Sequence, residues 1–156
     1  MRLWRSWLLV LSLALVGGHS AAALAQDAKV VLTSRAPFAK VAAALEQAIA
    51  GQRMGLVCHA NAQQGAAARG IKIPGNQVFL VFRNDFAVRL ISADPQAAFE
   101  APIRIYLYEN RDGTAILVYA KPSALLQVYA HPEAVRVGAE LDPIFQKIAT
   151  KAVAVQ

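Results

Sequence analysis

The chain has 156 residues, a formal net charge of +6 and 56% apolar residues, which suits one globular domain with a sizeable core. Its basic residues are scattered rather than clustered, which argues against a nucleic-acid-binding protein. Cys58 is the only cysteine, so an intramolecular disulfide, a cluster of metal-binding cysteines and haem attachment through two cysteines are all excluded.

The first 25 residues are predicted to be a cleavable signal peptide. Arg2 and Arg5 precede the apolar run 8–16, and Ala23-Leu24-Ala25 forms a cleavage motif before Gln26. The apolar run is shorter than the about 20 residues that a transmembrane helix needs. We therefore expect a periplasmic or secreted protein, residues 26–156, with no stable membrane anchor after cleavage.

Strands and helices follow one another along the predicted mature chain. A strand at 29–34 precedes a helix that Pro37 can begin and Gly51 ends. The apolar residues of this helix recur on one face: Phe38, Val41, Ala42, Leu45 and Ile49. Further strands are predicted at 54–59 and 77–83, with a short helix over 61–69 between them and another helix after Asn84-Asp85.

The stretch 101–123 predicts a β-hairpin onto which the other elements pack. The runs 103–109 and 114–120 are β-branched and aromatic, and Asn110-Arg111-Asp112-Gly113 supplies turn residues between them. A two-residue loop at Asp112-Gly113 and a four-residue type I turn are both compatible with these residues. The two loops differ in register by two residues, so both predict the same faces.

One predicted face of the hairpin is aliphatic, with Ile103, Ile105, Leu107, Ile116 and Val118. The other carries Arg104, Tyr106, Tyr108, Leu117 and Tyr119. The aliphatic face is expected to receive the helices. Tyrosines suit a partly wet surface, so the second face is a subunit interface, a small-molecule site or an ordinary solvent-facing side where tyrosine has good strand propensity.

Two helices are predicted after the hairpin. Pro122-Ser123 begins one over 124–129, which His131-Pro132 ends, and Asp142-Pro143 begins the last. The last helix carries one apolar stripe: Leu141, Ile144, Phe145, Ile148 and Ala152. The fold class predicted is α+β, a two-layer sandwich with a mixed or antiparallel sheet, a central β-hairpin and helices packed on one face.

At this point the sequence resembles a family, the domain of unknown function 302 (DUF 302), over roughly residues 29–149. The residues that carry the resemblance are Gly55-Leu56-Val57, Gly70-Ile71-Lys72-Ile73-Pro74, Val78 to Phe82 with Arg83-Asn84-Asp85, Ala101-Pro102-Ile103-Arg104, Glu109, Asp112-Gly113, Tyr119 and Pro122. Asn84-Asp85 stands where the family pattern has Asn-Pro, and Ile103 stands where some members have cysteine. The resemblance implies a compact α+β fold that often pairs into dimers, and it implies no established activity.

Cys58-His59 is the one pair that suggests chemistry, as a thiol nucleophile with a base, a redox centre, or a metal or haem ligand. Adjacent strand residues point to opposite faces, so a direct pair needs a bulge or a strand end. Cys58 is expected to be buried and inert beside Leu56 and Met54. His59 with Asn61 marks a strand end, where sites are often built.

Arg83-Asn84-Asp85 either caps the following helix or binds an anion. No motif of a serine hydrolase, zinc protease or phosphate-binding loop occurs in the sequence, and neither catalytic residues nor a metal site is assigned. The favoured function is that of a non-enzymatic exported homodimer that binds a small molecule. No nucleic-acid partner is expected, and the sequence indicates no particular cofactor. A thiol-dependent enzyme or redox carrier using Cys58, and a non-covalent haem or metal binder, are the alternatives.

Overall fold

The computed structural model describes residues 28–156. The predicted signal peptide lies outside these residues. Within residues 28–156, no helix has the length and apolar character that crossing a membrane requires.

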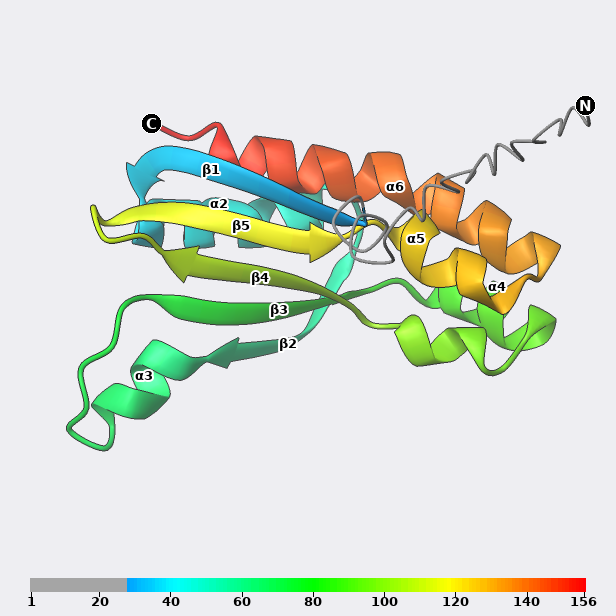
Figure 1. Cartoon of the computed structure of the whole chain (residues 1–156), viewed down its shortest axis with the longest axis horizontal. Helices are drawn as coiled ribbons and strands as arrows, with labels where there is room; N and C mark the ends of the chain where they lie inside the picture. Colours follow the sequence, from blue (N-terminus) through cyan, green and yellow to red (C-terminus); the bar gives the residue numbers. More distant parts are fainter. Residues whose placement is uncertain (1–27) are drawn as a thin grey trace, which may run out of the picture.

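Five antiparallel strands form one sheet in the order β1-β5-β4-β3-β2 (Figure 1). Their bounds are β1 Lys29–Pro37, β2 Gly55–Asn61, β3 Asn76–Phe82, β4 Ile103–Glu109 and β5 Thr114–Ala120. The predicted hairpin supplies β4 and β5, and β4 is the central strand. Along β3, β4 and β5 buried residues alternate with partly exposed ones, as in a sheet with one packed face.

Helices α2 (Phe38–Gly51) and α6 (Pro132–Val153) pack against each other and cover one face of the sheet. In Figure 1 α2 lies behind the strands and α6 runs along the top, beside β1. Val41, Leu45 and Ile49 of the predicted stripe are fully buried, together with Phe145 and Ile148 of α6. Each such side chain contributes about 1.5–3 kcal/mol by leaving water. The α+β sandwich with helices on one face is confirmed, and its sheet is antiparallel throughout the described residues.

The remaining helical segments lie at the two ends of the sheet (Figure 1). They are α3 Ala62–Ala67, α4 Asn84–Ala93, η1 Ala97–Glu100, α5 Pro122–Leu126 and η2 Gln127–Tyr129. Helix α4 packs on α6, and α5 packs on both α6 and η1. Helices α4 and α5 and the segment η1 therefore lie together at one end of the sheet.

Helix α6 begins at Pro132, so the prediction that the last helix starts at Asp142-Pro143 is wrong. Pro132 is in the first turn, and the Nδ1 atom of His131 accepts a hydrogen bond from the Glu133 amide at 3.2 Å. Pro143 lies inside the helix. A proline in a helix costs about 3 kcal/mol, but the buried face of α6 continues on both sides of it and keeps the helix intact.

The hairpin loop gives β5 the opposite facing from the prediction, so that the side chains predicted to point outward point into the core. Gly113 has a φ of 81° and its amide bonds to the Asn110 carbonyl, while the Asn110 amide bonds to the Thr114 carbonyl. This is a three-residue loop with a left-handed glycine, whereas both predicted loops had an even number of residues. Because one residue changes the parity, every β5 side chain exchanges faces.

The consequence is that Leu117 and Tyr119 lie in the core, and Ile116 and Val118 lie on the outer face. Leu117 is 0% exposed and pairs with Leu107, and Tyr119 is 5% exposed and pairs with Ile105. The Tyr119 ring packs against Phe145 at 5.8 Å between centroids. Burial, followed by the charge of Asp142, raises the pKa of Tyr119. Tyr119 is therefore a core residue with no place on the predicted tyrosine face.

Candidate functional site

The face of the sheet turned away from α2 and α6, called the outer face here, is covered by no helix or strand of residues 28–156 (Figure 1). Arg104, Tyr106 and Tyr108 lie on it, as predicted. The rings of Tyr106 and Tyr108 stack with centroids 5.3 Å apart, and the Asn76 amide donates a hydrogen bond to the Tyr106 hydroxyl. The tyrosines are thus held in place and half-exposed.

The strand register builds an apolar row across this face. Val31 pairs with Val118, Val118 with Tyr106, and Tyr106 with Val78, so four neighbouring strands each contribute one residue. A second row has Tyr108 paired with Ile116. Val31 is 59% exposed. We call Val31, Val78, Tyr106, Tyr108, Ile116 and Val118 the outer patch.

A groove of about 420 Å³ lies at one end of the outer face. Leu80, Val118 and Ala120 form its floor on the strands, and η1 and α5 form its walls. The polar and aromatic groups that line it are Lys29, Phe99, Glu100, Arg104, Tyr106 and Tyr119. Its size is that of a typical small-molecule site.

Arg104, Tyr106 and Tyr119 are the lining residues that the sequence indicates as site candidates. Leu80 could also have been found, because alternation along the run 77–82 puts it opposite the buried Phe79 and Val81. Lys29, Phe99 and Glu100 come from separate segments, and no spacing in the chain indicates that they meet. Tyr119 lines the groove although only 5% of it is exposed.

Cys58 and His59 point to opposite sides of β2. Cys58 pairs with Leu80 on the outer face, and His59 pairs with Phe79 on the core side, where the two rings stack at 4.4 Å. The His59 Nε2 atom lies 3.0 Å from Gln77 Oε1, and its Nδ1 atom lies 3.5 Å from Glu46 Oε1. These contacts hold His59 away from the thiol, so the two residues form no nucleophile and base pair.

The expectation that Cys58 is buried beside Leu56 and Met54 is wrong, because its side chain is exposed. The register shifts between Leu56 and Cys58, which is a β-bulge at Val57. A bulge inserts one residue and reverses the facing of the later residues of the strand, so Met54 stays buried while Cys58 turns outward. Among residues 28–156 no group of three histidine, cysteine or acidic side chains is placed to hold a metal ion.

Asn61 and the segment Arg83-Asn84-Asp85 have local structural roles. The Asn61 carboxamide oxygen accepts a hydrogen bond from the Gln64 amide and caps α3. Arg83 is the N-cap residue of α4 and makes no side-chain cap, so the predicted cap by Asn84-Asp85 is not a side-chain hydrogen bond to the helix. Instead Arg83 donates to Asp85 at 2.8 Å and lies over the Phe86 ring. The bond from Arg83 holds the pKa of Asp85 below its usual value.

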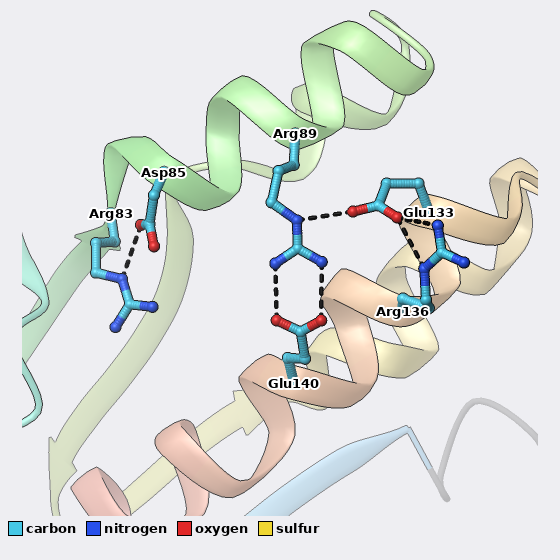
Figure 2. A network of polar contacts seen from close by, with 6 residues as sticks. All are labelled: Arg83, Asp85, Arg89, Glu133, Arg136 and Glu140. Atoms are coloured by element: carbon cyan, nitrogen blue, oxygen red, sulfur yellow. Dashed lines mark hydrogen bonds and ion pairs between the residues drawn. The ribbon is translucent and has the colours of Figure 1, made fainter.

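An ion-pair network joins α4 to α6 (Figure 2). The Arg89 guanidinium donates two hydrogen bonds to Glu140, at 2.7 and 2.8 Å, and one to Glu133 at 2.7 Å. Arg136 also binds Glu133. The hydrogen bonds to these two carboxylates, the one to Glu140 more than the one to Glu133, raise the pKa of Arg89. The network fixes the helices at the groove end of the sheet.

Arg89→Met is expected to lower the urea midpoint at pH 7 and to flatten its acid dependence. Arg136 and Arg89 hold the pKa of Glu133, and Arg89 that of Glu140, below 4.5. Carboxylates with a lowered folded pKa stabilise above their unfolded pKa, and the contribution disappears as pH falls through the folded value. The wild type should therefore lose more of its free energy of unfolding than the variant as the pH falls below about 4.3, the ordinary pKa of glutamate.

The measurement is the urea midpoint of both proteins at a series of pH values across this range. Methionine keeps the alkyl packing of Arg89 near Phe86, so the difference reports the charge. Lys147→Met, on the exposed side of α6, is the matched control and should follow the wild-type profile. Parallel profiles for wild type and Arg89→Met would contradict the expectation.

Taken together, the fold and this site define a small α+β domain with one helical layer, an open sheet face and a groove at its end. The chain belongs to the DUF302 family, described as a domain of unknown function, whose family model matches residues 30–151. The predicted resemblance is confirmed. No curated protein matches this chain in sequence.

The fold is also that of a solved structure, an uncharacterized conserved DUF302 protein from Bacillus stearothermophilus. The two chains are 13% identical, and the alignment covers 80% of this chain and 98% of that one with a TM-score of 0.70. At this identity the likeness shows the fold alone.

Proposed function

We propose that this protein is a non-enzymatic binding module that forms a homodimer through its outer patch and holds a small ligand on the same face. The observation that carries the proposal is the unbroken apolar row across β1, β5, β4 and β3. Soluble monomers rarely leave a contiguous apolar patch larger than a few hundred Å² exposed. The separation of Cys58 from His59 supports a binding role over thiol chemistry.

The size of the outer face fits a second copy of the chain. Strands of seven residues are about 23 Å long, and five strands span about 24 Å, so the face measures about 550 Å² before side-chain relief is included. A standard interface buries about 800 Å² per partner. The face is therefore large enough for the core of a dimer interface.

The distribution of charge also favours a second copy. The outer patch contains no charged residue, while Arg104 and Lys29 lie at the groove end. In a two-fold dimer each copy offers the same patch, so apolar rows meet apolar rows and the cations stay outside the seam. The tyrosine hydroxyls can lie at the wet rim of such an interface.

Ile116→Lys tests the pairing. Ile116 lies on the outer patch but does not line the groove. Lysine there brings two like charges into an apolar seam, which costs several kcal/mol, so the dimer dissociation constant should rise on the order of a hundredfold. Native mass spectrometry and sedimentation equilibrium of protein made from the full chain measure this. The same spectrum tests export to the periplasm or medium, which requires a mature chain beginning at Gln26.

Val88→Lys provides the matched control. Val88 is 51% exposed on α4, away from the sheet, so the same substitution there should leave the dimer intact. A monomeric wild type, or equal dimerisation in both variants, would show that the outer patch is ordinary surface.

A further inference from the structure

The groove beside η1 combines an apolar floor with two cations. Leu80, Val118 and Ala120 line its base, and Lys29 and Arg104 stand at its sides. Within residues 28–156 neither cation forms an ion pair. In the register of the sheet Lys29 of β1 pairs with Ala120 of β5, and Arg104 of β4 pairs with Leu80 of β3. Because β5 lies between β1 and β4, the two cations stand on either side of β5.

The single carboxylate that lines the groove, that of Glu100, already has a hydrogen-bond partner. Glu100 accepts a hydrogen bond of 2.8 Å from the Tyr129 hydroxyl, and its charge leaves the groove with one net positive charge. This bond to Glu100 raises the pKa of Tyr129. A ligand that satisfies the groove therefore needs one anionic group for the cations and an apolar body for the floor.

Phe99 strengthens this conclusion. Its side chain is 86% exposed, although it lines the groove at the wall formed by η1. An aromatic ring at a rim gains by covering an apolar ligand. Tyr106 contributes a second aromatic ring.

We propose that this groove binds an amphipathic organic anion, a carboxylate carrying an aliphatic or aromatic body. The carboxylate lies between Lys29 and Arg104, and the body lies on Leu80 and Val118 under Phe99. Guanidinium and carboxylate form two parallel hydrogen bonds, which makes Arg104 the principal anchor. The inference rests on the proposed ligand-binding function. Because Tyr106 and Val118 belong both to the groove and to the outer patch, binding is compared in the dimer and in Ile116→Lys.

Three other hollows among residues 28–156 fit a ligand less well. A hollow of about 460 Å³ is lined entirely by residues of one segment, 61–73, and has one cation and no aromatic ring. A cavity of about 20 Å³ near Phe86 and Leu90 has room for a single water. A hollow between β1 and α6 is lined by one cation, Lys121, and one carboxylate, Asp142. Of these four hollows, the groove beside η1 is the one with two cations over an apolar floor.

A two-dimensional NMR titration of the isotope-labelled protein with octanoate tests the inference. Octan-1-ol and octylammonium share the apolar body but carry no charge or the opposite charge. We expect shifts at Leu80, Phe99 and Val118, with octanoate bound most tightly and octylammonium least. Arg104→Gln should weaken octanoate binding roughly tenfold or more, because a hydrogen bond to a charged group is lost.

Arg111→Gln is the matched control. Arg111 is exposed in the hairpin loop at the other end of β4, so the same change of charge there should leave octanoate affinity unaltered. Arg104 is also exposed, and thermal unfolding will verify that both variants stay folded.

The outcomes separate this inference from the proposed dimer. If Ile116→Lys is monomeric and still binds octanoate through Arg104, both proposals stand. If the wild type is dimeric but shows no groove shifts, or binds octylammonium equally well, the anion site is wrong and the dimer remains. If the wild type is monomeric yet binds octanoate through Arg104, the pairing is wrong and the site remains.

Discussion

Leu117→Lys is expected to prevent folding, while Ile116→Lys, one residue earlier on the same strand, leaves the domain folded. Leu117 is 0% exposed and packs opposite Leu107 between the sheet and the helices. Ile116 lies on the outer face opposite Tyr108. The same new charge is thus buried at one position and placed at a partly open surface at the other.

The energies decide the outcome. Removing a buried leucine side chain alone costs about 2–5 kcal/mol, and an uncompensated buried charge adds about 3–5 kcal/mol. Domains of this kind have only about 5–15 kcal/mol of stability. Leu117→Lys is therefore expected to remove most or all of the free energy of unfolding. In Ile116→Lys the new side chain can extend its ammonium group into water.

Circular dichroism during thermal unfolding distinguishes the two variants. Ile116→Lys should show a cooperative transition and Leu117→Lys should show none. The reverse result, with Leu117→Lys folded and Ile116→Lys unfolded, is the outcome that an even-numbered hairpin loop predicts. The pair of variants consequently measures the register of β4 and β5 in solution.

That register shows where reasoning from the sequence stops. The strands of the hairpin, its glycine and the apolar stripe of α2 follow from local residue types, because each depends on neighbours within a few positions. The facing of β5 depends on whether three or four residues close the loop. Asn110 and Gly113 suit both, and a single residue of difference places Tyr119 in the core rather than on the outer face.

The same limit applies to β2 and to the groove. The bulge at Val57 has no distinctive residue type, yet it turns Cys58 outward and leaves His59 against Phe79. Arg104 and Tyr106 were predictable because β4 alternates regularly. Lys29 and Phe99 join them only through the strand order and the position of η1, and these are properties of the tertiary structure.

Gly138→Ala is expected to destabilise the domain by about 3 kcal/mol, at the upper end of the range for overpacking. A Cβ atom at Gly138 would lie 2.7 Å from the Ser123 Cα, 3.1 Å from the Pro122 carbonyl oxygen and 3.2 Å from the Ser123 amide nitrogen. All three atoms are backbone, so α5 as a whole must move away from α6.

Moving α5 also breaks its connection to Asp142. That carboxylate accepts hydrogen bonds from the Ser123 amide and hydroxyl, at 2.9 and 2.6 Å. Alanine gains about 1 kcal/mol over glycine in helix propensity, which offsets only part of the loss. Hydrogen bonds to a charged group contribute about 1.5–3 kcal/mol each, so the net effect stays destabilising.

Gly65→Ala is the matched comparison, because a Cβ atom at this position of α3 has nothing within 4 Å. It should stabilise the domain by up to about 1 kcal/mol. Urea unfolding should therefore move the midpoint in opposite directions for the two glycines. Equal midpoints would mean that α5 and α6 are not in close contact.

Since Leu125 of α5 lines the groove, Gly138→Ala should also weaken octanoate binding, and Gly65→Ala should leave it unchanged.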